Sequence, residues 1–210
     1  MCSVSPSSFA IGRFITWRTE FMKDLKTAIL MLIVFTVICG GVYPALVTAI
    51  AQAVFPYQAN GSVIKDKTGR VVGSVLIGQP FSDPKYFWPR PSATADFANN
   101  PAASGGSNAG PTNPAYLATV AERVKTLRHA GLTGPVPAEL VQASASGLDP
   151  HITPGAAMVQ IPRIAKVRVM STVALEGLVR AHIEDRQLGI LGSPRVNVLE
   201  LNLELDTLKP

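Results

Sequence analysis

The sequence predicts one N-terminal transmembrane helix followed by a single mixed α+β extracytoplasmic domain. Two observations support this division. Residues 27–64 contain no charged side chain, and residues 28–54 are almost wholly apolar. The rest of the 210-residue chain has no second run of this kind, is long enough for one domain with its own core, and mixes helical and strand-like patterns without a regular βαβ rhythm.

The apolar run is long enough for a membrane anchor, because a helix needs about 20 apolar residues to cross the hydrocarbon core. The alanines around Ala51 resemble a signal-peptide cleavage site. However, the apolar region of a signal peptide is roughly 7–15 residues long, and this one is longer. We therefore expect a retained transmembrane helix over residues 27–55.

Basic residues predict the orientation of this anchor. Arg13, Arg18, Lys23 and Lys26 precede it closely, and the next basic residue after it is Lys65. The positive-inside rule then places residues 1–26 in the cytoplasm and residues 56–210 outside it. The segment 22–26 is typical of a translation start, so we expect residues 1–21 to be an upstream extension.

The anchor contains a stripe of small side chains that suits a partner helix. Gly41, Ala45 and Ala49 recur at every fourth position, and such a face lets another helix approach closely. Pro44 removes a backbone hydrogen bond to the carbonyl of Gly40. The alternative is that Gly and Ala are merely common in membrane helices. We expect packing against a partner in a membrane, with lipid on the remaining faces.

Composition excludes several classes of function. The net charge is +5, but the basic residues are scattered, so we expect no nucleic-acid partner. The two cysteines, Cys2 and Cys39, cannot cross-link the soluble domain. His129 and His182 lack a second ligand at a suitable spacing, so we expect no metal site.

The soluble domain begins with strand and loop patterns. Residues 66–69 predict a turn, and the β-branched run 71–78 predicts a strand. Residues 81–92 combine four aromatic residues with three prolines, which predicts an ordered loop, folded over the core or presented to a partner. Residues 97–113 form a long polar loop. Its Gly105-Gly106-Ser107 segment lacks the lysine of a phosphate-binding loop, so we expect no cofactor site.

Helical patterns dominate the second half of the domain. Asn113 and Pro114 predict a helix start, and Gly131 its end. Thr153-Pro154 predicts a second start, and Pro162 an interruption. A third helix is expected from about Thr172 to Gly189. Strict alternation in residues 199–206 predicts a half-buried strand.

Two segments contain groups that could suggest an enzyme. Asp149 and His151, with Ser144 or Ser146, are the components of a hydrolase, but Asp149 and His151 are only two residues apart on a proline-stiffened turn. Residues 66–69 spell the phosphorylation tetrapeptide of P-type pumps without the large domains such pumps need. We expect no catalytic residue in this chain.

Several ordered motifs resemble one family. They are the segments 86–92, 104–108, 110–114, 146–151 and 196–202, together with the single N-terminal span. In this order they resemble the C subunits of the Kdp high-affinity potassium-transporting ATPase, and only residues 1–21 fall outside the resemblance.

The resemblance implies a non-catalytic accessory subunit of a bacterial inner-membrane complex that imports potassium and uses ATP. Its partners would be a channel-like potassium-translocating subunit, a P-type ATPase subunit that hydrolyses ATP, and a very small single-span subunit. The family's C subunit stabilises assembly and has been proposed as a catalytic chaperone that raises the pump's affinity for ATP. With the N-terminus in the cytoplasm, such an effect would pass through the span.

Two loops, 81–92 and 144–154, are our candidates for contact with partners. Their candidate contact residues are Tyr86, Phe87, Trp88, Arg90, Asp149 and His151. The alternative outside the family is a membrane-anchored extracytoplasmic ligand-binding module, in which the aromatic residues of 81–92 grip a sugar or a peptide.

Overall fold

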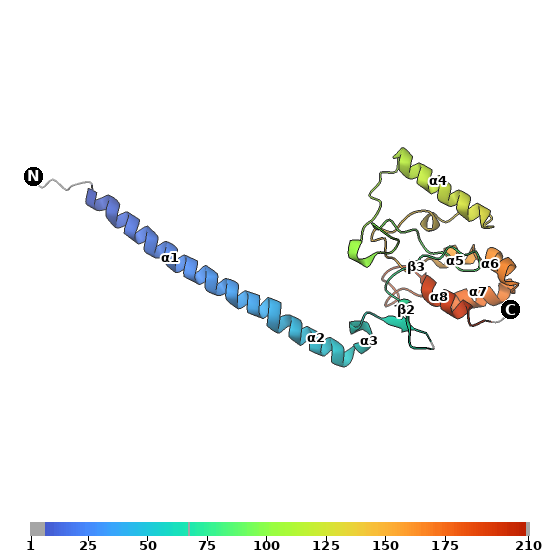
Figure 1. Cartoon of the computed structure of the whole chain (residues 1–210), viewed down its shortest axis with the longest axis horizontal. Helices are drawn as coiled ribbons and strands as arrows, with labels where there is room; N and C mark the ends of the chain where they lie inside the picture. Colours follow the sequence, from blue (N-terminus) through green and yellow to red (C-terminus); the bar gives the residue numbers. More distant parts are fainter. Residues whose placement is uncertain (1–6, 67, 209–210) are drawn as a thin grey trace, which may run out of the picture. The chain divides into compact units, whose positions relative to one another are not determined.

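The computed structural model describes residues 7–66 and 68–208, and the chain divides into two compact units, Met1–Asn60 and Gly61–Pro210. In the first unit, the structure describes a continuous helix from Ser7 to Val54 (Figure 1). It comprises α1 (Ser7–Val37), the π-helical turn η1 (Ile38–Val42) and α2 (Tyr43–Val54), and the short α3 (Pro56–Ala59) follows. Its segment Phe21–Val54 is long and apolar enough to cross a membrane, and its most apolar stretch is not buried within the chain.

The π-helical turn lies directly before a proline. Pro44 has no N–H to donate, and its ring would clash with the carbonyl of Gly40 in a regular α-helix. The N–H of Tyr43 donates to the carbonyl of Ile38, five residues earlier instead of four. The wider turn thus takes the helix past the proline without ending it.

The second unit begins with a β-hairpin of β1 (Val63–Lys65) and β2 (Val71–Ser74), paired antiparallel. The Asp66 Oδ1 atom accepts hydrogen bonds from the backbone N–H groups of Thr68 (2.8 Å) and Arg70 (3.0 Å). The predicted turn is confirmed. The predicted strand is shorter than expected, because the chain turns after Ser74.

A second antiparallel sheet has the strand order β3-β5-β4. Its strands are β3 (His151–Ile152), β5 (Arg195–Asn197) and β4 (Ile183–Glu184). Helix α7 lies against helices α5, α6 and α8, and both α5 and α8 contact strand β5 (Figure 1). These four helices are α5 (Pro154–Met158), α6 (Ile161–Arg168), α7 (Thr172–Ala181) and α8 (Val198–Leu205). The arrangement is the mixed α+β domain that the sequence predicts.

Helix α4 (Pro114–His129) begins as the sequence predicts. The Asn113 Oδ1 atom accepts hydrogen bonds from the N–H groups of Ala115 (3.0 Å) and Tyr116 (3.3 Å), and Pro114 takes the first helical position. After the helix, Gly131 has a φ of +99°, a left-handed conformation that favours glycine. Two single 3₁₀ turns, η2 (Pro101–Ala103) and η3 (Ala138–Leu140), lie before and after α4.

The C-terminal segment corrects one prediction. Residues 199–206 alternate strictly, but the chain forms helix α8 there instead of a strand. The Asn197 Oδ1 atom accepts from the N–H groups of Leu199 (3.1 Å) and Glu200 (3.3 Å), which caps a helix start. The buried residues also fit one helical face, and they are Val198, Leu199, Leu201, Asn202 and Leu205. The apolar pattern of this segment fits both the two-residue period of a strand and the 3.6-residue period of a helix. The cap at Asn197 therefore favours the helix.

Two further boundaries differ from the sequence predictions. Helix α7 ends at Ala181 and not at Gly189, because the chain enters strand β4 at Ile183. Pro162 does not break a helix, since it lies in the first turn of α6, where a missing N–H is tolerated.

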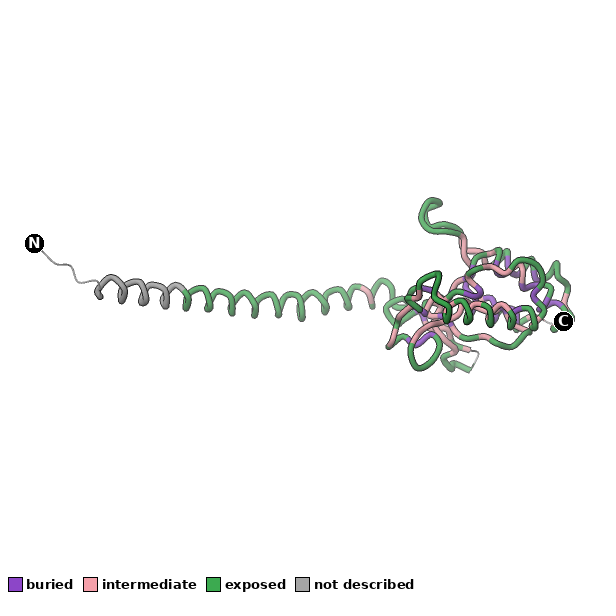
Figure 2. Tube along the Cα trace, turned by 90° about the horizontal axis from the view of Figure 1, so that it is seen from above, coloured by how far each residue is buried: buried purple, intermediate pink, exposed green. Residues whose placement is uncertain are grey.

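The core of the second unit lies among its helices and the aromatic loop. Figure 2 shows the buried residues gathered in this unit, whereas the described part of the long helix is almost entirely exposed. Large apolar side chains with at most 2% exposure include Phe87, Leu132, Ile152, Ile164, Leu175, Leu201 and Leu205. The core thus joins a loop residue, Phe87, to helices that lie far from it in the sequence.

Two buried amides hold the aromatic loop by its backbone. The Asn202 side chain accepts from the Phe87 N–H (2.8 Å) and donates to the Phe87 carbonyl (2.9 Å). The Gln160 side chain does the same for Trp88, accepting from its N–H (2.8 Å) and donating to its carbonyl (3.1 Å). Consecutive backbone groups that would otherwise be buried without partners are therefore satisfied.

A buried cation reinforces this attachment. The Arg163 side chain donates to the carbonyls of Pro84 and Tyr86 and to the side chain of Gln160, and its guanidinium lies 4.7 Å from the centre of the Trp88 ring. Burial lowers the pKa of Arg163 to about 10, although the negative charge of Asp83 opposes this change. Arg163 thus remains charged at neutral pH.

We predict that Asn202→Leu destabilises the domain, because both backbone groups of Phe87 would lose their partners in a buried place. At about 1–3 kcal/mol for each of the two buried polar groups, the free energy of unfolding should fall by about 2–6 kcal/mol. Denaturant unfolding of the full chain in detergent, followed by tryptophan fluorescence, measures the change.

The matched control is Glu204→Leu, which places the same residue on the exposed side of α8. We expect its effect to stay within about 0.5 kcal/mol. Equal destabilisation by the two substitutions would contradict the clamping role of Asn202.

Candidate functional site

The structure brings the two predicted contact loops together. The Arg90 Nη1 atom lies 3.0 Å from the Asp149 Oδ2 atom, in an ion pair whose two side chains are about 30% exposed. The Ser92 hydroxyl donates to the carbonyl of Gly147 (2.8 Å). The loops 81–92 and 144–154 therefore form one surface, although more than 50 residues separate them in the sequence.

The polar loop 97–113 joins the same cluster. The Asn99 side chain donates to the carbonyl of Gly147 (3.0 Å), and the Gly105 N–H donates to the carbonyl of Ser146 (2.9 Å). A Cβ atom on Gly106 would lie 2.9 Å from the carbonyl oxygen of Ala145. Gly106 thus permits close backbone packing, and the Gly105 N–H is already hydrogen-bonded within the chain.

Asp149 is the polar centre of this cluster. Its Oδ1 atom accepts from the His151 N–H (3.0 Å) and lies 3.5 Å from the His151 Nδ1 atom. Burial favours the neutral acid, but hydrogen bonds from His151 and the positive charge of Arg90 outweigh burial, so the pKa of Asp149 lies below its usual value of 3.8. At neutral pH the carboxylate is therefore ionised, with Arg90 at its Oδ2 atom and His151 at its Oδ1 atom.

The serines near Asp149 shape the loop. The Ser146 hydroxyl accepts from the N–H of Leu148 (3.1 Å), and the Ser144 and Ser146 hydroxyls lie 3.5 Å apart. In the described residues, no hydrogen bond connects either hydroxyl to the His151 ring. This geometry does not assemble the nucleophile and base of a hydrolase.

The three aromatic candidates have different environments. Phe87 is fully buried, so its side chain belongs to the core and not to the surface. The Tyr86 hydroxyl donates to the Asp206 carboxylate (2.9 Å), and the Trp88 indole donates to the carbonyl of Asp83 (3.0 Å). Tyr86 and Trp88 are half-buried, which leaves part of each ring accessible.

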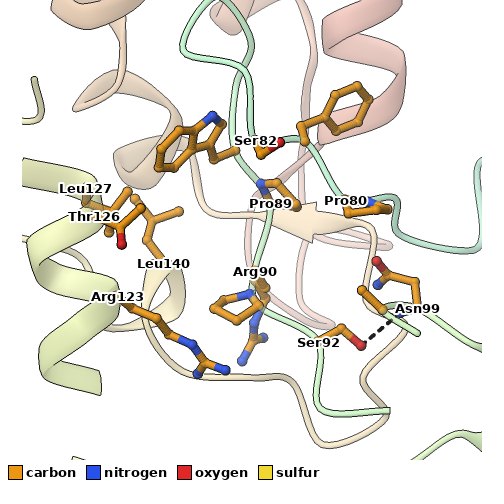
Figure 3. Close-up of a pocket in the computed structure, with 14 residues that line it drawn as sticks. Pro80, Ser82, Pro89, Arg90, Ser92, Asn99, Arg123, Thr126, Leu127 and Leu140 are labelled. Carbon is orange, nitrogen blue, oxygen red and sulfur yellow. Dashed lines mark hydrogen bonds between the residues drawn. The ribbon is translucent and has the colours of Figure 1, made fainter. Parts of the chain in front are cut away.

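A pocket of about 340 Å³ opens beside Trp88 and Arg90 (Figure 3). Its wall on the other side comes from helix α4 and includes Arg123, Thr126 and Leu127. Sequence reasoning missed Arg123 as a site residue. The helical spacing could have identified it. Arg123 lies four residues before the apolar Leu127, so both side chains are on the same face of the helix.

The small residues of the predicted packing stripe lie around the π-helical turn. Gly41 is inside η1, and Ala45 and Ala49 are in α2. All three are exposed, and a Cβ atom on Gly41 would contact nothing within 4 Å. The described residues contain no cluster of three or more His, Cys, Asp or Glu side chains suited to a metal ion.

We predict that the stabilising effect of Asp149 depends on pH. A carboxylate whose pKa is lowered by folding stabilises the fold above its usual pKa, and this contribution disappears as the pH falls through the lowered pKa. Asp149→Asn should therefore lower the melting temperature at pH 7, and the difference from the unaltered chain should shrink below about pH 4. A difference that stays constant from pH 7 to pH 3 would contradict this account.

Comparisons with known proteins assign the family. The family model described as "KdpC: K+-transporting ATPase, c chain" matches residues 25–207. The Potassium-transporting ATPase KdpC subunit of Geobacter sulfurreducens is 72% identical over 189 residues, which cover 90% of this chain and all of the relative. The subunits of the same name from Geobacter metallireducens and Methylococcus capsulatus are 68% and 59% identical, again over 90% of this chain and their whole length. The chain therefore belongs to the KdpC family, the c chains of the K+-transporting ATPase.

Proposed function

We propose that this chain is a non-catalytic accessory subunit that stabilises an ATP-driven, high-affinity potassium import complex. The observation that supports this most strongly is the match along the whole length of relatives named as potassium-transporting ATPase subunits. The described residues contain one candidate span, which is also consistent with a subunit, because one helix cannot enclose a polar pathway by itself. Transport and ATP hydrolysis then belong to partner chains.

The proposed location is the bacterial inner membrane, with residues 27–55 as the span. The basic residues Lys23 and Lys26 precede the most apolar stretch and favour a cytoplasmic N-terminus. Residues 56–210 would then lie in the periplasm. The proposed partners are a channel-like potassium-translocating subunit, a P-type ATPase subunit and a small single-span subunit.

The effect on ATP affinity is proposed to act through the membrane helix. In this orientation the soluble domain has no access to cytoplasmic ATP. The Asp66 carboxylate, which begins the tetrapeptide shared with P-type pumps, is engaged by Thr68 and Arg70 in a hairpin turn. A change in ATP affinity would therefore come from contacts between the span and the pump subunit, with potassium as the transported ion.

A second candidate function is a membrane-anchored module that binds a ligand outside the cytoplasm. The 340 Å³ pocket favours it, because its size and partly aromatic lining are typical of ligand sites. A module of this kind should remain stable and bind its ligand without partner chains.

Gentle detergent extraction of a tagged chain from native cells tests the proposed function. We expect two larger membrane proteins to co-purify, one of them a P-type ATPase, and the preparation to hydrolyse ATP faster when potassium is added. Mass spectrometry identifies the partners. A chain that is extracted alone and is stable would favour the ligand-binding module.

We predict that Gly41→Leu weakens assembly of the complex while the soluble domain stays folded. The chain itself has space for the larger side chain, so a loss of partners would reflect a helix that packs closely on Gly41. Co-purification of partners in detergent measures the loss, and thermal unfolding checks the soluble domain.

The matched control is Gly40→Leu. Gly40 lies in the same π-helical turn, and a Cβ atom there would also contact nothing within 4 Å. The two variants therefore share the change in helix propensity but differ in the face they alter. Unchanged recovery of partners with Gly41→Leu would exclude the proposed packing.

A further inference from the structure

The pocket beside Trp88 combines apolar walls with two arginines. Its apolar wall includes Phe81, Trp88 and Leu140, together with Pro89 and Pro91. Arg90 comes from the aromatic loop and Arg123 from helix α4 across the pocket, and in Figure 3 both guanidinium groups extend toward the lower part of the view. Two cations therefore face one partly apolar space.

The charge of this pocket is not balanced from within. No Asp or Glu is among the described residues that line it. Arg90 is paired with Asp149, but Arg123 donates to a neutral group, the carbonyl of Val141 (2.8 Å). The neighbouring Glu122 is paired with Lys125 at 2.7 Å. One half-buried positive charge is thus left for an incoming anion.

We propose that this pocket binds a carboxylate flanked by apolar groups, supplied by an acidic side chain in the extracytoplasmic part of a partner subunit. This inference rests on the proposed function. Charge complementarity selects a carboxylate, which can accept two hydrogen bonds from a guanidinium. The apolar walls provide a place for the neighbouring side chains of the partner.

A protein partner is a better occupant than a small organic acid for two reasons. Arginine and tryptophan are the residue types that most often dominate binding energy at protein interfaces, and the pocket contains both. The loop that supplies them is fixed by buried amides and by Arg163, so the pocket exists before binding and little ordering is required.

The test is co-purification of the partner subunits with the full-length chain from cells that make the whole complex. Arg123→Glu places a negative charge opposite the proposed carboxylate, so we expect at least a tenfold loss of retained partners. Arg128→Glu is the matched control. Arg128 is on the same helix and also donates to a carbonyl, that of Leu132 (3.0 Å), but it does not line the pocket.

A second variant keeps the test decisive if Arg123→Glu fails to fold. Thr126 lines the pocket and is exposed, so Thr126→Trp should fill the space without disturbing the core. A folded Thr126→Trp chain should also lose its partners. Thermal unfolding of each variant establishes which ones fold.

Three results would overturn the inference. The first is full retention of partners by a folded Arg123→Glu or Thr126→Trp chain. The second is an equal loss with Arg128→Glu. The third is tight binding of benzoate to the isolated chain in calorimetry, abolished by Arg123→Glu while the complex stays intact, which would assign the pocket to a small organic acid. If even the unaltered chain retains no partners, the proposed function itself fails.

Discussion

The attachment of one irregular loop by two buried amides is the constraint on which the rest of the domain depends. No strand of the described chain lies beside Phe87 and Trp88, yet their backbone groups are paired as they would be in a sheet, because Asn202 and Gln160 each supply one donor and one acceptor. A carboxamide suits this role because it carries a donor and an acceptor next to each other in a neutral group. Helices α6 and α8 thereby become the scaffold for the loop.

This attachment also determines where charge can be placed. Arg163 is almost fully buried and would be costly if its donors faced only apolar groups. The loop turns the carbonyls of Pro84 and Tyr86 toward it, so both terminal nitrogens of the guanidinium have partners in the loop, while the buried Nε atom has none. Two residues beyond Trp88, Arg90 is then held where Asp149 can pair with it. A core contact and a surface ion pair are therefore parts of one connected network.

The sequence predicted local features better than long-range ones. Asn113 and Pro114 identified the start of α4, because capping depends on neighbours within one turn. The apolar pattern of the α8 segment fits both a strand and a helix, and the side-chain cap at Asn197 is the local feature that distinguishes them.

The two contact loops were recognised by their residues, but their meeting was not predictable from a single sequence. It depends on close backbone approaches, such as that of Gly106 to Ala145, which leave no periodic pattern. The same reason explains why Arg123 was missed, since only the folded chain places it opposite Arg90.

The π-helical turn in the membrane segment divides that helix into two halves with different rotational phase. A π-helical turn holds about one residue more than an α-helical turn, which offsets the faces after Tyr43 by about 100° from those before Ile38. By the same count, the face with Ala45 and Ala49 lies about 60° from the face with Ile29 and Ile33, whereas an unbroken α-helix would place these two faces about 160° apart. One side of the helix can therefore present side chains of both halves to the same neighbouring surface.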